Sequence, residues 1–204
     1  MIEILDNELI NWRKGNIITN IENFINHYNI QNIFLDVDGV LWHSCQAVCD
    51  IINKQQNTNF TGNQVLGWNF KEICPNLTDD DIEKIFADMD FFTYVTWIKG
   101  AIGFLVRHAD DITIVTKGTD KNINRKEKFF RDCGLGHIEI IGLPLDYSKS
   151  IINMKDGLFI DDCTKNLNES NAKYKIQFCE YNDGMNEKRE WIKDWNGLKM
   201  YKWG

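Results

Sequence analysis

Short runs of consecutive apolar residues along the chain predict buried β-strands. The candidates are residues 33–35, 111–115, 138–141, 157–160 and 176–179. A strand that is covered on both faces of a sheet is apolar at successive positions and does not alternate. The runs therefore predict strands of a sheet with helices on both faces.

Apolar residues three and four positions apart predict helices between these runs, at residues 19–28, 43–54, 78–89 and 121–133. Thr19, with Glu22 three residues later, and Thr78, followed by acidic residues, are the expected N-terminal caps, and Gly134 is a good C-terminal cap. Strands that alternate with helices through short connections favour a parallel sheet with right-handed crossovers. The pattern therefore predicts an α/β fold.

The segment between the first two predicted strands is far longer than an ordinary crossover needs. We expect residues 43–99 to form an inserted, mostly helical cap, and residues 1–42 and 100–204 to form the α/β core. The amphipathic residues 1–15 are expected to be a helix or arm on the core. In the C-terminal tail, Trp191 and Trp195 are four residues apart, which predicts one helical face packed back onto the core.

Polar residues follow three of the predicted strands. Asp36, Asp38 and Gly39 follow the first, residues 116–119 end the second, and Asp161 with Asp162 ends the run at 157–160. Ligands of such sheets bind beyond the carboxyl ends of the strands, so these clusters should converge on one site. Adjacent carboxylates repel, and a hard cation such as Mg²⁺ is the simplest neutraliser. The alternative for the Asp36–Asp38 stretch alone is a surface turn that caps a helix.

Composition limits the partners. A formal net charge of −7 argues against a polymeric nucleic acid, whose binding needs many lysines and arginines. The six cysteines contain no Cys-x-x-Cys pair, which favours free thiols in a reducing cytoplasm. No apolar run has the length of a membrane span, and the acidic N-terminus does not resemble a signal peptide. We expect a cytoplasmic monomer or homodimer that does not bind membranes.

The polar clusters, taken in order, resemble the four motifs of the haloacid dehalogenase superfamily of phosphotransferases. Asp36-Val-Asp38-Gly-Val resembles the first motif, Thr116 the second, Lys149 in Tyr-Ser-Lys-Ser the third, and Asp161-Asp162 the fourth. The Asp-Gly-Val-Leu-Trp and Phe-Ile-Asp-Asp-Cys-Thr-Lys-Asn stretches most resemble the 5'(3')-deoxyribonucleotidase group. The resemblance implies a Rossmann-like core with a cap and a Mg²⁺-dependent phosphatase activity.

The resemblance also implies residue roles. Asp36 would attack phosphorus to give an aspartyl-phosphate, and Asp38 would act as general acid and then base. Thr116 would bind a phosphoryl oxygen, and Lys149 would neutralise charge. Lys117 is a candidate substrate-binding residue and the alternative phosphate-neutralising lysine. The carboxylates of Asp36 and Asp161 and the backbone carbonyl of Asp38 would hold Mg²⁺. Asp162 could orient a metal-bound water or cap the helix that starts at Thr164.

Aromatic residues near the predicted site indicate the substrate. Trp42, Trp68 and Phe70 could stack on a nucleobase, or they could form the cap's own small core. The leading hypothesis is hydrolysis of nucleoside (deoxy)monophosphates. The alternatives are a phosphatase of another small metabolite, such as a sugar phosphate, and a non-catalytic domain that keeps the fold.

Overall fold

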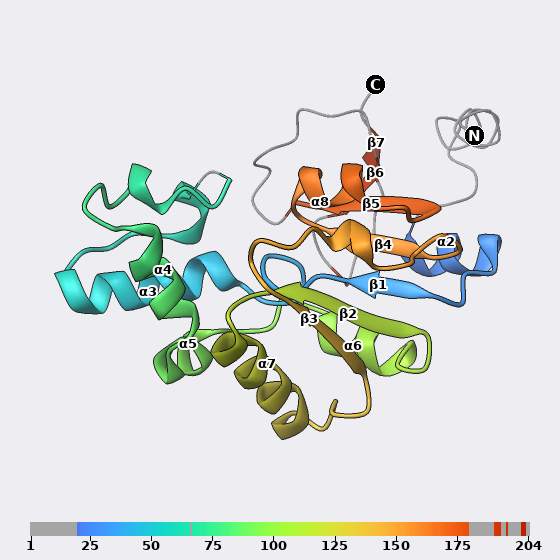
Figure 1. Ribbon diagram of the computed structural model, residues 1–204, viewed down its shortest axis with the longest axis horizontal. Helices are drawn as coiled ribbons and strands as arrows, with labels where there is room; N and C mark the ends of the chain where they lie inside the picture. The colour runs from blue at the N-terminus through green and yellow to red at the C-terminus, as the bar shows by residue number, and fades with distance from the viewer. Residues whose placement is uncertain (1–19, 66, 180–189, 193–194, 196–200, 203–204) are drawn as a thin grey trace.

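The computed structural model describes residues 20–65, 67–179, 190–192, 195 and 201–202 and centres on one seven-stranded sheet (Figure 1). Its strand order is β3-β2-β1-β4-β5-β6-β7, and every neighbouring pair is parallel except β6 and β7. The strands are β1 Ile33–Leu35, β2 Ile112–Lys117, β3 Glu139–Leu143, β4 Leu158–Asp161, β5 Tyr174–Phe178, β6 Glu190–Ile192 and β7 Tyr201–Lys202. The five strands predicted from apolar runs are confirmed, and the fold is α/β.

The strand order explains why the polar clusters meet. β1 lies between β2 and β4, and Leu35 is level with Ile114 on one side and with Ile160 on the other. The amide of Asp36 continues this ladder by donating to the Ile160 carbonyl at 3.0 Å. The chain therefore leaves all three strands at the same edge of the sheet, where parallel sheets bind ligands.

Helices cover both faces of the sheet. α2 Ile21–Tyr28, α6 Ala101–Arg107 and α7 Asp120–Asp132 contribute buried residues to the larger hydrophobic core. The helix α8 Thr164–Glu169 and the short turn η3 Lys149–Ile151 belong to the opposite side, where α8 contributes to a smaller core. Figure 1 shows α8 above the sheet and α6 and α7 below it. None of the described helices has the length and apolar character needed to cross a lipid bilayer.

The segment between β1 and α6 is helical, as the sequence predicts. It contains α3 Ser44–Gln56, η1 Gly62–Gln64, η2 Phe70–Glu72, α4 Asp79–Phe86 and α5 Met89–Tyr94. Figure 1 shows this group at the left, beyond the carboxyl ends of β1 and β2. Its two ends run side by side, because the His43 amide donates to the Thr96 carbonyl at 3.0 Å and the Ile98 amide to the Leu41 carbonyl at 2.8 Å. We call residues 43–99 the insertion; that it is a separate cap domain stays a prediction.

Two helix predictions need correction at their ends. Asn20, not Thr19, caps α2, because its side chain accepts a hydrogen bond from the Asn23 amide at 2.8 Å. The predicted helix at 78–89 is two helices, since Asp88 caps a new one after α4 ends at Phe86. The cap at Thr78 is confirmed, with Asp81 completing a capping box.

The C-terminal prediction is partly wrong. Trp191 lies in β6, which pairs with β5, so it shares no helical face with Trp195. Trp195 does pack onto the core: its ring stacks on Phe178, and its indole donates to the Val40 carbonyl at 2.8 Å. The predicted arm at residues 1–15 and the Thr19 position lie outside the described residues.

Candidate active site

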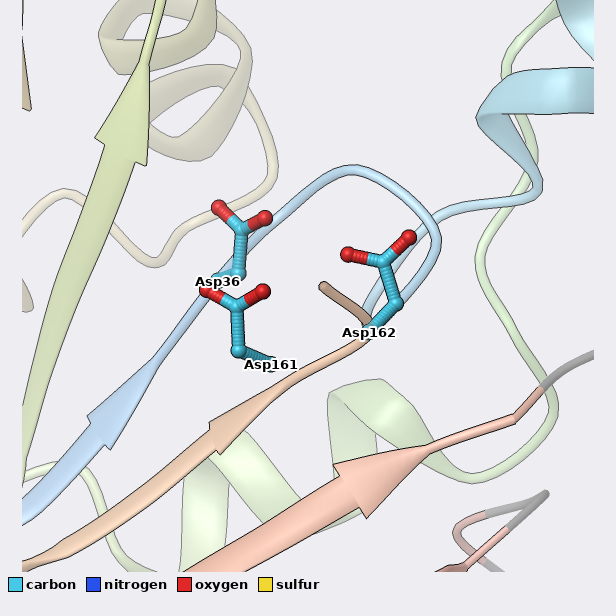
Figure 2. Close-up of side chains that lie close together, drawn as sticks. All are labelled: Asp36, Asp161 and Asp162. Carbon is cyan, nitrogen blue, oxygen red and sulfur yellow. The ribbon is translucent and has the colours of Figure 1, made fainter. Parts of the chain in front are cut away.

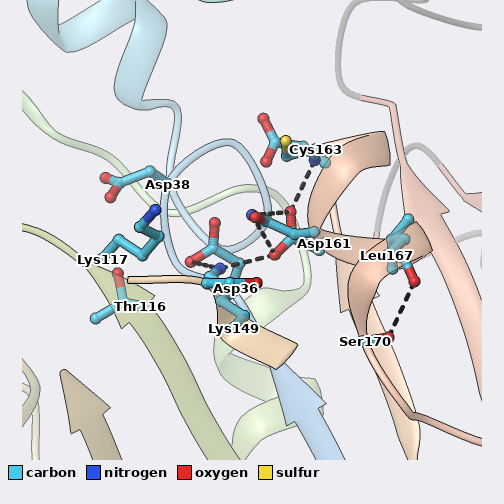
Figure 3. A network of polar contacts seen from close by, with 12 residues as sticks. Asp36, Asp38, Thr116, Lys117, Lys149, Asp161, Cys163, Leu167 and Ser170 are labelled. Atoms are coloured by element: carbon cyan, nitrogen blue, oxygen red, sulfur yellow. Dashed lines mark hydrogen bonds and ion pairs between the residues drawn. The ribbon is translucent and has the colours of Figure 1, made fainter. Parts of the chain in front are cut away.

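A buried lysine joins two buried aspartates at the carboxyl edge of the sheet. Asp36 follows β1, Asp161 ends β4, and Lys149 comes from η3. The Lys149 Nζ lies 2.8 Å from Asp36 Oδ1 and 2.7 Å from Asp161 Oδ2 (Figure 3). Burial by itself lowers the pKa of Lys149, but the Asp161 and Asp36 carboxylates raise it above its ordinary value. Lys149 is therefore a fixed positive charge beside Asp36.

Local hydrogen bonds hold Asp161 and Lys149 in place. Asp161 Oδ1 accepts from the Cys163 amide at 2.8 Å, and both carboxylate oxygens accept from Asn166 Nδ2 on α8, at 3.2 and 3.1 Å. Ser148 caps η3 by accepting from the Ser150 amide at 3.2 Å, which fixes the backbone that carries Lys149. The first turn of α8 and the η3 turn thus preorganise this part of the site.

Three carboxylates form a cluster that could hold a cation. One oxygen from each of Asp36, Asp161 and Asp162 lies within 4.8 Å of the others (Figure 2). Asp36 Oδ1 is buried and has no hydrogen-bond partner of suitable geometry among the described residues, although Lys149 lies close by. Burial, followed by the Asp161 and Asp36 charges, raises the pKa of Asp162 well above its ordinary value. Burial and the charge of Asp36 also raise the pKa of Asp161, against the lowering effect of Lys149.

This donor set fits Mg²⁺. Carboxylate oxygens are the ligands that this hard cation prefers. The orphaned oxygen of Asp36 and the mutual repulsion within the cluster are both relieved by a positive charge placed among the three groups.

A second buried lysine, which sequence reasoning missed, anchors Asp38. Lys126 on α7 is fully buried, and its Nζ forms an ion pair with Asp38 Oδ2 and donates to Thr116 Oγ1 at 2.8 Å. Ser44 Oγ donates to the other Asp38 oxygen at 2.8 Å. The signal was present in the sequence: the buried residues of α7 are Asn122, Lys126 and Phe130, four positions apart along one helix face.

A cavity of about 220 Å³ lies between the core and the insertion. Its lining residues are Asp36, Asp38, Trp68, Glu83, Phe86, Lys117, Gly118, Thr119, Asn122, Leu145, Lys149, Asp162, Cys163 and Asn166. Thr116 and Asp161 are fully buried just behind this lining. The insertion supplies an aromatic wall, in which the ring centroids of Trp68 and Phe86 are 6.0 Å apart.

Two of the predicted substrate-binding residues reach the cavity and two do not. Trp68 and Lys117 are part of its lining. Trp42 is fully buried in the larger core, with its ring centroid 5.0 Å from that of Phe129. Phe70 is also buried and packs against Trp68, with ring centroids 6.3 Å apart. For Trp42 and Phe70 the structure therefore supports the alternative reading, a packing role, and Phe86 takes a place in the wall that sequence reasoning did not assign.

The fold defines the class of protein. A haloacid dehalogenase-like family hydrolase from Streptococcus pneumoniae has a TM-score of 0.54 and 14% sequence identity, covering 80% of this chain and 93% of that chain. A predicted phosphoglycolate phosphatase from Haemophilus somnus 129pt has a TM-score of 0.49 and 16% identity, covering 75% of this chain and 88% of that chain. The S. pneumoniae structure shows that the fold is haloacid dehalogenase-like.

Within that class the family can be stated. The chain belongs to the 5' nucleotidase, deoxy (pyrimidine), cytosolic type C protein family (NT5C), whose model matches residues 29–200. It is accordingly a phosphoric monoester hydrolase of the 5'-nucleotidase type. No curated protein sequence matched the chain.

Proposed function

We propose that the protein is a Mg²⁺-dependent phosphatase that hydrolyses the phosphate monoester of nucleoside (deoxy)monophosphates through an aspartyl-phosphate intermediate. One observation carries the proposal: Lys149 lies 2.8 Å from an Asp36 oxygen and 2.7 Å from an Asp161 oxygen at the cavity wall. A carboxylate nucleophile next to a fixed cation and a candidate metal site has the parts that phosphoryl transfer requires, which are chiefly position and charge.

Asp36 is the nucleophile of the proposed reaction. Its carboxylate attacks phosphorus, a new oxygen–phosphorus bond forms, and the bond to the nucleoside oxygen breaks in line with it. Lys149 stays protonated and balances charge on Asp36 and on the transferred group. Water then attacks the same phosphorus, the bond to Asp36 breaks, and inorganic phosphate leaves.

Asp38 moves the proton in both steps. It donates a proton to the leaving nucleoside oxygen and later accepts one from the attacking water. Ser44 and Lys126 bind its two oxygens, which supports a fixed orientation toward the cavity that Asp38 helps to line. The Thr116 hydroxyl accepts from Lys126, so its own proton is available for a phosphoryl oxygen. Lys117 adds positive charge to the cavity wall.

Mg²⁺ fits this site and would be held by the carboxylates of Asp36 and Asp161 and by the backbone carbonyl of Asp38, with Asp162 beside them. When bound, it supplies positive charge that stabilises the phosphoryl oxygens during transfer.

Trp68 and Phe86 support a planar leaving group, because their rings lie in the cavity wall. The family description names deoxy pyrimidine nucleotides and a cytosolic type, and it supports our proposal of a deoxypyrimidine nucleotide substrate and a cytoplasmic location for this chain.

The test is phosphate release from deoxy- and ribonucleoside monophosphates and from sugar phosphates, with Mg²⁺ or with a chelator. Wild-type protein should turn over deoxypyrimidine monophosphates only with metal, and Asp36→Asn and Lys149→Met should abolish turnover. Lys155→Met, at an exposed position away from the cavity lining, is the matched control and should behave like wild type.

Turnover of sugar phosphates alone would keep the chemistry and overturn the substrate. Absence of turnover in a folded protein would favour a non-catalytic binding domain. Turnover that survives Asp36→Asn would overturn the assignment of the nucleophile.

A further inference from the structure

One hydrogen bond connects the insertion to the acidic cluster. The indole Nε1 of Trp68 donates to Asp162 Oδ2 at 2.6 Å, although the two residues are 94 positions apart. Asp162, like Asp36, belongs to the acidic cluster and lines the cavity. Among the described residues, Trp68 is the one side-chain donor to the Asp162 carboxylate. This hydrogen bond therefore connects the Asp162 carboxylate directly to the insertion.

The backbone around Trp68 is built to make this contact. Trp68 has a φ of 66°, a left-handed conformation that is uncommon for a bulky residue and costs about 1–3 kcal/mol. Gly67, just before it, has a φ of 56°. Phe86 and Phe70 pack against the indole, with ring centroids 6.0 and 6.3 Å away. The strain is maintained by a packed environment, which fits a functional position better than a free loop.

The first-motif turn leaves the room that this contact needs. A Cβ on Gly39 would lie 2.8 Å from Asp162 Oδ2 and 3.0 Å from Trp68 Cζ2. Three segments that are far apart in the sequence therefore meet at one point: the turn after β1, the turn after β4, and the insertion. A side chain at position 39 would therefore collide with the Asp162 carboxylate and with the Trp68 ring.

We propose that Trp68 is a positioning residue for the metal site, so that the insertion completes a site whose carboxylates all belong to the core. The inference rests on the Mg²⁺ site of the proposed function. Asp162 lies beside the proposed ligands Asp36 and Asp161, and residues that surround and orient a metal site typically change its metal affinity by about 10- to 100-fold. Because coupling is reciprocal, a bound cation must stabilise the Trp68–Asp162 contact by the same factor that this contact adds to cation affinity.

The experiment measures Mg²⁺ binding by calorimetry in the absence of any substrate. Trp68→Phe keeps an aromatic ring and removes the indole donor, so its Mg²⁺ dissociation constant should rise by about 10- to 100-fold. Trp97→Phe is the matched control: it also removes an indole from the insertion, but its ring packs against Trp42 and Phe129, and its affinity should equal that of wild type. Equal Mg²⁺ affinity of Trp68→Phe and wild type would overturn the proposal.

A double-mutant cycle separates positioning from general loosening. Asp162→Asn keeps an oxygen acceptor and removes the charge, and adding Trp68→Phe to it should weaken Mg²⁺ binding no further, because Trp68 acts through Asp162. Two losses that simply add would overturn the proposal.

Amide hydrogen exchange supplies a second measurement that needs no Trp68 variant. Mg²⁺ should slow exchange at residues 67–72 in wild type and not in Asp162→Asn, and equal slowing in both would contradict the coupling. If wild type turns over no phosphate ester but passes these binding tests, the proposed function fails while this inference stands. If it hydrolyses nucleotides but Trp68 leaves Mg²⁺ affinity unchanged, only this inference fails.

Discussion

The ammonium group of Lys126 is buried, where it forms an ion pair with the Asp38 carboxylate and donates a hydrogen bond to the Thr116 hydroxyl. Removing one partner of a buried ion pair typically costs about 3–5 kcal/mol, because the other charge is left unpaired. We therefore expect Lys126→Met to lower the free energy of unfolding by about 3 kcal/mol. Since Asp38 loses one of its two anchors, we also expect a fall of about 100-fold in kcat/KM.

Urea unfolding and phosphate release test this prediction. Lys128→Met is the control on the same helix: its ion pair with Asp132 is 60% and 61% exposed, so its loss should cost less than about 1 kcal/mol. Equal stabilities for the two variants would mean that the buried pair has no special weight.

Gly39 is a second residue whose effect can be isolated. Its φ of 71° favours glycine, and a Cβ there would meet the Asp162 carboxylate and the Trp68 ring. Gly39→Ala should lower the unfolding free energy by about 1–2 kcal/mol from backbone strain, and weaken Mg²⁺ binding through steric displacement. Gly134→Ala supplies the strain alone, because φ there is 78° and nothing lies within 4 Å of the added Cβ. Calorimetric Mg²⁺ affinities that fall equally in both variants would contradict the steric argument.

At the scale of elements, one carboxylate connects α2 to the end of α6. Glu22 Oε1 accepts from Arg107 Nη2 at 2.6 Å and from Nε at 3.0 Å, and Glu22 Oε2 lies 2.6 Å from His108 Nε2. Burial by itself raises the pKa of Glu22, but the Arg107 and His108 contacts prevail and hold it below its ordinary value. A lowered carboxyl pKa gives stability above the ordinary pKa, about 4.3, that is lost as pH falls through the lowered value.

Glu22→Gln should therefore lower the unfolding free energy by about 1 kcal/mol at pH 7, and the difference should shrink as pH falls below about 4. Urea unfolding across this pH range measures it. Glu127→Gln, which loses an exposed 3.7 Å ion pair with Arg131 on α7, should have an effect below about 0.5 kcal/mol at either pH. A Glu22→Gln difference that grows on acidification would refute the assigned sign.

The elements that sequence reasoning located are those with a local signal. Continuous apolar runs marked the strands, and Thr78 with Asp81 marked the start of α4. Trp191 was misplaced because a spacing of four residues also occurs in a strand, and the pairing of Trp191 with Gln177 is a long-range contact that spacing does not report. Helix ends depend on a competition between adjacent caps, which Asn20 wins over Thr19.

For the site, the order of the motifs predicted that Asp36, Asp38, Lys149 and Asp161 would lie together, and parallel register explains why Asp36 and Asp161 meet at one edge of the sheet. The catalytic roles of these residues stay predictions. The direction in which a side chain points, toward the cavity or into the core, could not be predicted from the local sequence. Trp42 is four residues from Asp38 in sequence, yet its ring turns into the core. Lys126 belongs to a lysine-rich helix whose composition is typical of a solvent-exposed helix. It nevertheless faces inward, because it lies on the same helix face as the buried residues Asn122 and Phe130.

At the scale of the whole molecule, the acidic cluster links folding to cation binding. Repelling carboxylates oppose folding, and a ligand that binds only the folded state stabilises it by about 2.7 kcal/mol at 100 times its dissociation constant. For a chain of this size that corresponds to a rise of about 5–10 °C in Tm. We expect such a rise with Mg²⁺ in thermal denaturation, reversal by chelator, and none with NaCl of equal ionic strength. Asp36→Asn should lose the rise; keeping it in full would exclude Asp36 from the cation site.

The way in which the insertion is joined to the core also affects how such a protein can evolve. Its two ends are hydrogen-bonded to each other, from His43 to Thr96 and from Leu41 to Ile98, so the chain leaves the core and returns to it at neighbouring points. The helices between these two ends can therefore lengthen or shorten while this junction with the core stays the same. Evolution can therefore change the residues that the insertion contributes to the cavity wall, while the core residues proposed to bind phosphate stay the same. The paired backbone at residues 41–43 and 96–98 is therefore the junction at which the insertion of one such protein could be joined to the core of another.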